Sequence, residues 1–125
     1  METTFYELLG REPGIRALVD RFYDLMDTLP EAREVRALHF ETLEGSREKL
    51  YLFLVGWSGG PQVYVERFGH PRLRARHLPF TIGDAARDQW MLCMTRALED
   101  TVPDVEVRGM MQRTLARIAD HMRNV

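Results

Sequence analysis

Hydrophobic side chains recur at helical spacing in the first third of the chain. From about Gly14 to Thr28 they lie three and four residues apart, at Ile15, Leu18, Val19, Phe22, Met26 and Leu29. This spacing places them on one face of a helix. Pro30 ends that helix, because proline cannot continue it, and can open a short turn through about Ala37.

The pattern returns from Ser46, where the apolar positions are Leu50, Phe53, Leu54 and Trp57, and stops at Gly59-Gly60-Pro61. The next segment, 62–69, shows little periodicity. A brief helical stretch between Pro71 and Pro79 has room for about two turns at most. We therefore expect loops to dominate the middle third of the chain.

Two long helices are expected at the end of the chain. Thr81, followed three residues later by Asp84, is a capping signal for the first of them, which should end near Asp100. Its expected buried face is Ala86, Trp90, Cys93, Met94, Ala97 and Leu98. The last helix should run from about Pro103 to Arg123 and bury Val107, Met110, Met111, Leu115, Ile118 and Met122.

No stretch alternates with period two, so the predicted fold class is all-α without a sheet. Helices of a plain bundle are similar in length and joined by short loops. The uneven middle of this chain suggests that something other than helix packing fills its centre.

Composition narrows the class of protein. A chain of 125 residues with 45% hydrophobic residues fits a single domain over 1–125. Its 19 acidic and 17 basic residues leave a net charge of -2, which disfavours a nucleic-acid partner. No segment is apolar enough to span a membrane, and none resembles a leader, so a cytoplasmic location is expected.

The single cysteine excludes an internal disulfide framework. Cys93 is either a reactive thiol or a small buried side chain. Its position among Trp90, Met94 and Ala97 at helical spacing favours the buried interpretation.

Of the four histidines, His39, His70, His77 and His121, only His77 has a suggestive context. It follows Leu73 by four residues and so shares a helical face with it, while Arg74 and Arg76 bracket that face. A neutral imidazole in an apolar pocket with nearby guanidinium groups is what an iron porphyrin with two propionates requires. Zinc is the competing interpretation, but the chain has neither a second cysteine nor a His-Glu-x-x-His motif.

The run Gly69–Phe80, followed by Arg87-Asp88-Gln89-Trp90, resembles the proximal segment of group II truncated haemoglobins. Upstream, Arg21-Phe22-Tyr23, Phe53-Leu54 and Trp57–Pro61 are similar to the same family in order and spacing. The resemblance covers nearly the whole chain. It implies a truncated globin fold, a two-over-two helical sandwich that encloses haem b.

The resemblance also implies roles for individual residues. His77 aligns with the iron ligand, Tyr23 with the distal tyrosine and Trp90 with the distal tryptophan of the group. His39 falls where the family places Tyr, Phe or His against the haem face. Further haem-contacting candidates are Arg76, Tyr64 and Lys49 near the propionates, and Ser46, Leu50, Phe53, Leu54, Leu73 and Phe80 along the pocket.

The chain departs from the family pattern at three places. A glycine pair before the second helix is reduced to Gly10 and a separate Gly14. Ser46 stands where other globins often have a distal histidine. His39 is followed by Phe40 rather than by proline, and a one-residue gap against some relatives falls just after it.

Donors from Tyr23, Trp90 and His39 would stabilise dioxygen, which carries partial negative charge on ferrous haem. Tight oxygen binding suits reaction with nitric oxide or peroxide activation better than bulk oxygen delivery, and turnover would need a separate electron donor or reductase. Polar distal groups can equally bind sulfide at ferric iron. A ligand-binding or sensing globin and an enzyme, either a nitric oxide dioxygenase or a peroxidase-like catalyst, both remain open. A haem-free helical interaction module, with Tyr23 and Trp90 as core aromatics, is the third interpretation.

Overall fold

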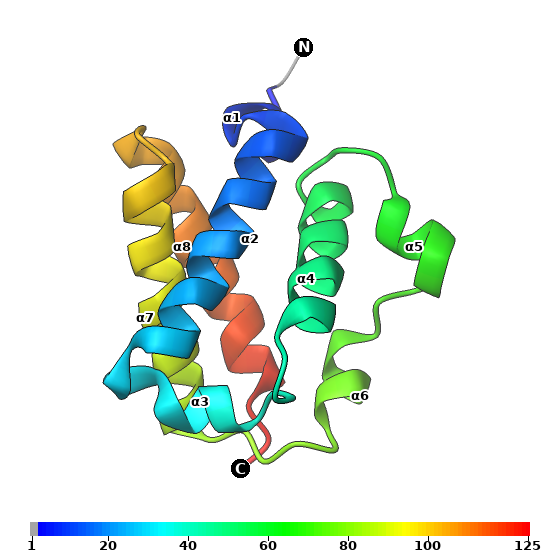
Figure 1. The fold of residues 1–125 in the computed structure, drawn as a ribbon. Helices are drawn as coiled ribbons and strands as arrows, with labels where there is room; N and C mark the ends of the chain where they lie inside the picture. The colour runs from blue at the N-terminus through cyan, green and yellow to red at the C-terminus, as the bar shows by residue number, and fades with distance from the viewer. Residues whose placement is uncertain (1–2) are drawn as a thin grey trace.

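Two pairs of long helices form the body of the structure (Figure 1). The computed structural model describes residues 3–125, which contain helices and no strand, so the predicted all-α class is confirmed. The elements are α1 (Phe5–Leu8), α2 (Arg11–Thr28), the 3-10 turn η1 (Pro30–Ala32), α3 (Arg33–Ala37), α4 (Glu44–Trp57), α5 (Val63–Phe68), α6 (Leu73–His77), α7 (Asp84–Thr101) and α8 (Val105–Met122). No helix within residues 3–125 is long and apolar enough to cross a membrane.

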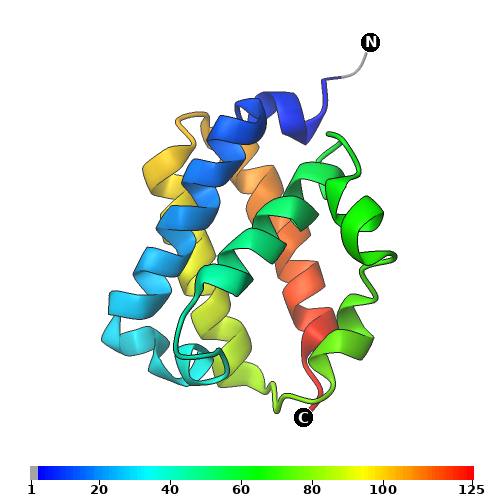
Figure 2. The same cartoon turned by 45° about the vertical axis from the view of Figure 1, so that its right-hand side comes forward.

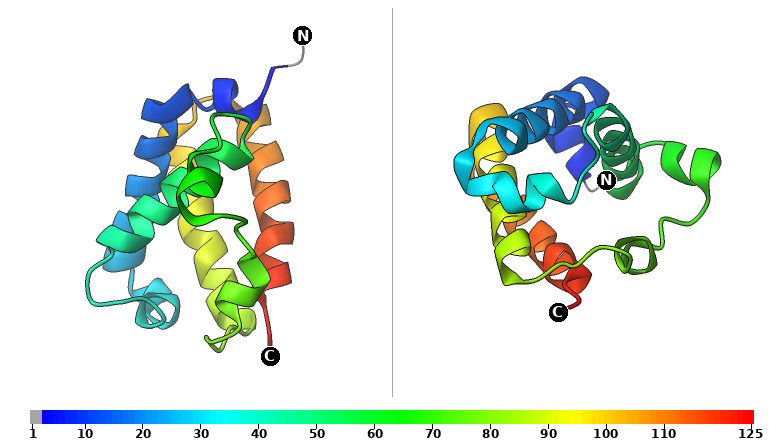
Figure 3. Two further views of the ribbon diagram at one scale, coloured as in Figure 1. Left: turned by 90° about the vertical axis from the view of Figure 1, so that its right-hand side faces the viewer. Right: turned by 60° about the horizontal axis from the view of Figure 1, so that its bottom comes forward.

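Helix α2 packs against both α4 and α7, and α7 packs against α8. With α4 turned toward the viewer, α2 and α4 lie across α7 and α8 (Figure 2). The chain from α4 to α7 leaves this body and returns in an arc that carries α5 and α6 (Figure 3). The two-over-two arrangement is therefore the one expected.

The apolar face of α2 forms the centre of the core. Ile15, Leu18, Val19 and Phe22 are completely buried, as the spacing predicts. Burying a side chain of this kind stabilises the fold by about 1.5–3 kcal/mol. The core continues into Cys93, Met94, Ala97 and Leu98 of α7 and Met111 and Leu115 of α8.

Helix α2 begins three residues before the expected start, and two glycines shape its entry. Gly10 has a φ of 90°. A side chain on Gly14 would place its Cβ only 1.7 Å from the Leu9 carbonyl oxygen. Both positions therefore require glycine. The preceding α1 was not predicted, because four residues are too few to show a helical period.

The prediction that loops fill 62–69 is wrong, since α5 occupies most of that segment. This helix depends on tertiary contacts. The ring of its buried Tyr64 lies edge-on to Phe53 of α4, with ring centroids 6.1 Å apart, and the Phe68 ring is tilted against Tyr64 at a centroid distance of 5.1 Å. The brief helix between Pro71 and Pro79 is confirmed as α6.

Thr81 does not cap α7, contrary to the prediction, because Gly83 occupies the N-cap position. Residues before the helix are instead held against the end of the chain. The Ile82 N–H donates to Asn124 Oδ1 at 2.9 Å, and the Asn124 N–H donates to the Ile82 carbonyl at 2.8 Å. Helix α8 is capped by Asp104, whose carboxylate accepts from two backbone N–H groups.

Three of the side chains expected to be buried, Trp90, Met110 and Ile118, are half-buried instead. Trp90 and Ile118 line the cavity described below. A helical pattern does not distinguish a core position from a cavity wall, because both are apolar and face inward.

Cys93 is completely buried, as expected, and burial raises the pKa of its thiol to about 11. We expect no reaction with Ellman's reagent in the native protein at neutral pH and full reaction in denaturant, because the thiolate is the nucleophile. The raised folded-state pKa contributes stability below the ordinary value of 9.0, and this contribution is lost as the pH rises toward 11. Rapid labelling of the native protein would contradict the buried position of Cys93.

Candidate functional site

A largely apolar cavity of about 500 Å³ lies between the two helix pairs and the arc that carries α5 and α6. Its volume is within the range of about 300–1,000 Å³ typical of pockets that bury a small molecule. Every residue predicted for the site lines it: Tyr23, His39, Ser46, Lys49, Leu50, Phe53, Leu54, Tyr64, Leu73, Arg76, His77, Phe80 and Trp90. The structure thus brings the candidates together, while the role of each stays a prediction.

His77 is the last residue of α6 and is half-buried at the cavity wall. Its Nδ1 is bonded to the carbonyl of Leu73 one turn earlier in the same helix. A carbonyl only accepts, so Nδ1 carries the proton and Nε2 keeps its lone pair. This is the arrangement in which a histidine is ready to bind a metal through Nε2.

Helix α6 is too short to hold its own position and is fastened to the end of α8. Nη1 of Arg74 donates to the carbonyls of His121 at 2.6 Å and Arg123 at 3.2 Å. The side-chain amide of Asn124 donates to the Phe80 carbonyl at 2.7 Å. The orientation of His77 therefore depends on the last turn of α8 and the residues that follow it.

The cationic candidates lie at the side of the cavity bordered by α5. The Arg76 guanidinium is 6.0 Å from the ring centroid of Tyr64, and Lys49 Nζ is 5.8 Å from that of Phe68. Both cations are exposed, whereas Tyr64 is buried. Charges at an exposed edge and an apolar interior match a flat apolar group whose carboxylates reach solvent.

Two of the polar aromatic candidates pack on Phe22, whose ring is completely buried, and the third packs on Tyr23. The Phe22 ring contacts Tyr23 and Trp90 edge-on, with ring centroids 4.8 Å and 5.0 Å away. The His39 ring lies 5.9 Å from that of Tyr23. Side chains from α2, α7 and the segment after α3 thus form one cluster, which we call the aromatic cluster.

Within residues 3–125, neither the Tyr23 hydroxyl nor the Trp90 indole N–H has a hydrogen-bond partner, although both side chains line the cavity. Burial raises the pKa of Tyr23, which is 5% exposed, so its hydroxyl keeps its proton. Neither donor atom is itself completely buried, so both can be reached from the cavity. A ligand in the cavity is the partner that the geometry offers both groups.

His39 is held by a hydrogen bond from Nδ1 to the Val35 carbonyl, 2.8 Å away. Its pKa is lowered mainly by burial and further by the positive charge of Arg36 and by His77, against the opposing effect of the Val35 bond. The ring is therefore neutral at neutral pH, with its lone pair on Nε2. In this tautomer Nε2 of His39 can accept a proton, and its role as a third donor to a ligand stays a prediction.

The segment after His39 is clamped by Arg36, which the sequence did not single out. Its guanidinium donates to Asp27 Oδ1 at 2.9 Å and to the carbonyls of Phe40 at 2.8 Å and Glu41 at 2.6 Å. Phe40 itself is 79% exposed although it lines the cavity. Arg36 therefore fixes the backbone on which His39 stands.

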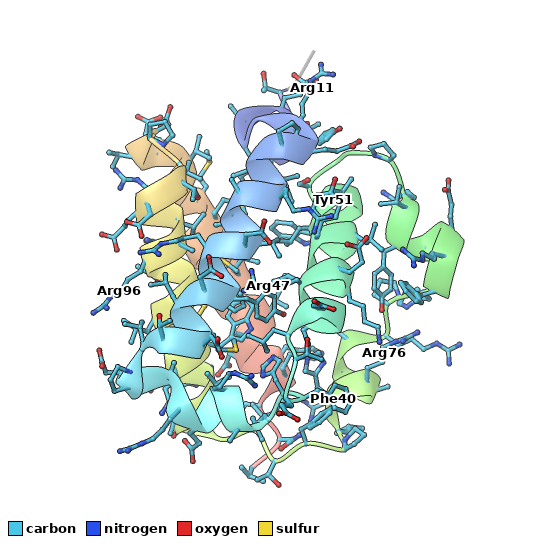
Figure 4. All side chains as sticks on the ribbon, viewed as in Figure 1. Arg11, Phe40, Arg47, Tyr51, Arg76 and Arg96 are labelled. Atoms are coloured by element: carbon cyan, nitrogen blue, oxygen red, sulfur yellow. The ribbon has the colours of Figure 1, made fainter. Side chains whose placement is uncertain are left out.

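Arg47 of α4 lies where α4 faces α2 (Figure 4), and it joins the two helices. Its guanidinium contacts the carboxylates of Asp20 at 3.3 Å and Asp24 at 2.6 Å, and lies 5.9 Å from the Tyr23 ring centroid. These contacts hold the two helices together where Tyr23 enters the cavity.

Several residues of the cavity wall were not predicted as site residues. They are Val35, Leu38, Phe40, Ile82, Ala86, Arg87, Leu115, Ile118, Ala119 and Met122. Ala86, Leu115, Ile118 and Met122 lie on the expected apolar faces, so their inward position was predictable but their contact with a ligand was not. Arg87 forms ion pairs with Asp120 of α8 at 2.6 Å and with Asp88 of α7 at 3.1 Å, so these two carboxylates already balance its charge.

The cavity fits a haem. An apolar interior takes the macrocycle, a histidine with a free Nε2 takes the iron, and exposed cations stand where propionates would reach solvent. Within residues 3–125, no three His, Cys, Asp or Glu side chains form a metal-binding group, so the zinc site considered from the sequence has no ligand set there.

Comparison with known proteins agrees with this fit. The sequence profile of the family described as bacterial-like globin matches residues 4–124. Group 2 truncated hemoglobin YjbI from Bacillus subtilis is 36% identical over 119 residues, which cover 95% of this chain and 87% of that protein. The group II 2-on-2 hemoglobin from Agrobacterium tumefaciens is 48% identical with a TM-score of 0.96, over 98% of this chain and 95% of that one.

A second similar structure, the truncated oxygen-avid haemoglobin from Bacillus subtilis, is 35% identical with a TM-score of 0.88, over 98% of this chain and 100% of that one. The family profile and these relatives each extend over nearly the whole chain. The chain belongs to the bacterial-like globins and is a group II truncated haemoglobin, whose cofactor is haem b.

Proposed function

We propose that this globin holds dioxygen against the aromatic cluster and that tight binding serves redox chemistry rather than bulk oxygen transport. The observation that carries the proposal is the pair of unpartnered donors, on Tyr23 and Trp90, at the wall of one apolar cavity. Haem supplies an iron that binds small diatomic molecules.

The side chains of the cavity would then have two roles, one toward the iron and one toward its ligand. His77 would ligate the iron through Nε2, and its bond to the Leu73 carbonyl fixes the ring. The Tyr23 hydroxyl and the Trp90 indole N–H, which line the same cavity, would donate to a partly negative ligand. Such donors stabilise charge more in an apolar cavity than in water, because water does not screen them.

The packing of the aromatic cluster supports a strong effect on the ligand. Phe22 contacts both donor rings and is itself completely buried, so neither ring can move without disturbing the core. Donors held in place lose little entropy when a ligand arrives. One relative of this chain is described as oxygen-avid, and the same property is proposed here.

The proposal is tested by measuring oxygen dissociation from the ferrous wild-type protein and its consumption of nitric oxide with a chemical reductant present. We expect slow oxygen release together with rapid loss of nitric oxide. Fast release of oxygen, of the kind that suits delivery, would contradict the proposal.

A peroxidase-like activity is the second candidate, and the position of His39 favours it. A neutral imidazole that lines the cavity with a free Nε2 can take a proton from peroxide. The distal donors could also hold sulfide at ferric iron. Sustained turnover by any of these routes would require a separate electron donor or reductase.

Replacing His39 with phenylalanine should flatten the pH dependence of the reaction with peroxide. Phenylalanine keeps the ring packing on Tyr23 but removes the base. The wild-type rate should fall as the pH drops through the lowered pKa of His39, because the protonated ring cannot accept a proton. Stopped-flow rates at matched haem content check this, and identical pH profiles for the two proteins would exclude His39 from the chemistry.

A further inference from the structure

A second hollow of about 670 Å³ lies beside the haem cavity, where α6 and the residues before it face α8. Four apolar side chains line both spaces: Phe53, Leu73, Ile118 and Met122. They are buried or half-buried, and together they form a common wall. We call this second space the side hollow.

The rim of the side hollow is cationic. Its charged groups are the guanidinium groups of Arg72, Arg74 and Arg117, which lie beside His70 and His121; all five side chains are exposed, and no Asp or Glu lines the side hollow. The whole chain has a net charge of -2. The basic rim is therefore a local departure from the charge of the molecule.

Two of these guanidinium groups are available to a ligand. In residues 3–125, neither Arg72 nor Arg117 is within ion-pair distance of a carboxylate. Arg87 and Arg123, at the same end of α7 and α8, are instead paired with Asp120 and Asp84 at 2.6 Å. Arg74 is already committed to the carbonyls of α8, so it shapes the rim.

Arg72 is also held in an unfavourable backbone conformation. Its φ is 46°, in the left-handed region, and its N–H donates to Nδ1 of His70 at 3.1 Å. This region is sterically unfavourable for a residue other than glycine. The turn thus keeps Arg72 on the rim at some cost to stability.

We propose that the side hollow binds a single-chain fatty acid, with its carboxylate on Arg72 and Arg117 and its alkyl chain on the common wall. An apolar floor beneath free guanidinium groups matches a ligand with one anionic end. Inorganic phosphate would leave the floor exposed to water. A broad acidic protein surface could meet the guanidinium groups but has no alkyl chain to cover the apolar wall.

Binding in the side hollow would change the surroundings of the haem. Leu73 belongs to the helix that carries His77, and its carbonyl accepts the bond from His77 Nδ1. Leu73 and Met122 line both spaces, so a ligand that packs on them in the side hollow lies on the opposite face of the wall of the haem cavity. We therefore expect fatty acid binding to shift the haem absorption bands without removing the haem.

The test is calorimetric titration of the haem-loaded protein with dodecanoate below its micelle concentration, with absorbance recorded in parallel. We expect one site per chain, no loss of haem, and much weaker binding of acetate and of dodecyltrimethylammonium. Arg117→Glu and Arg72→Glu should each weaken dodecanoate binding by about tenfold or more, since each replaces an attractive charge with a repulsive one.

Arg96→Glu is the matched control, because Arg96 is exposed on the outer side of α7, away from the side hollow (Figure 4). It changes the net charge equally and should leave the affinity unchanged. Equal effects of Arg117→Glu and Arg96→Glu would overturn the proposal. So would release of haem in proportion to dodecanoate, which would place the ligand in the haem cavity, or binding to anionic vesicles without binding of free dodecanoate.

Discussion

Replacing His77 with alanine is expected to leave the purified protein with little haem. His77 lines the cavity, and because its Nδ1 donates to the Leu73 carbonyl, the lone pair of Nε2 is free to ligate the iron. Loss of outer-shell partners alone commonly costs about 10–100-fold in metal affinity, so loss of the ligand itself should cost at least as much. Haem content by pyridine haemochrome and the ferrous absorption spectrum provide the measurement.

The matched controls are His70→Ala and His121→Ala, which remove exposed histidines from the same region without touching the haem cavity. Both should retain wild-type haem content. A His77→Gly variant should regain haem when imidazole is added, which separates loss of the ligand from loss of the fold. Wild-type haem content and an unchanged ferrous spectrum in His77→Ala would rule out His77 as the ligand.

Removing either donor of the aromatic cluster should speed oxygen release. Tyr23→Phe and Trp90→Phe each delete one desolvated hydrogen bond, worth about 1–3 kcal/mol, so each should raise the dissociation rate roughly tenfold to a hundredfold. The two effects should not add, because both donors serve one ligand and both rings pack on Phe22. A double-mutant cycle should show a coupling of about 1 kcal/mol.

Tyr51→Phe and Trp57→Phe are suitable controls for the stopped-flow measurement. Tyr51 lies under the Arg16 guanidinium, 3.7 Å away, and Trp57 stacks on Phe5, so both make the same chemical change outside the cavity. Their oxygen dissociation rates should equal that of the wild type. If Tyr23→Phe and Trp90→Phe also release oxygen at that rate, the two residues are core aromatics, and His39 or Ser46 must hold the ligand.

The long helices were predictable because each has enough turns for its apolar period to show. The short helices were not. The four residues of α1 carry no period, and α5 depends on the packing of Tyr64 against Phe53, which lies in another helix. The N-cap of α7 was predicted wrongly for a similar reason. Ile82 is bonded to Asn124, near the end of the chain, and Gly83 rather than Thr81 is the N-cap residue.

The site was predictable where local spacing determines it. His77 shares a helical face with Leu73, and both line the cavity as expected. The family resemblance alone predicted the proximity of Tyr23, His39 and Trp90. These residues lie on three separate elements, and no local spacing relates such elements. The clamp formed by Arg36 has no sequence signal, since its main partners are carbonyl groups, which every residue carries.

The fastening of α6 to the end of α8 also bears on the order of folding. The bond from Arg74 to the His121 carbonyl closes a loop of 47 residues. Contacts of such large sequence separation form slowly, because the entropy of closing the loop must be overcome before the contact stabilises anything. The helix that presents His77 is therefore among the last parts of the chain to become ordered, and capture of haem by that histidine should follow the docking of α8 rather than precede it.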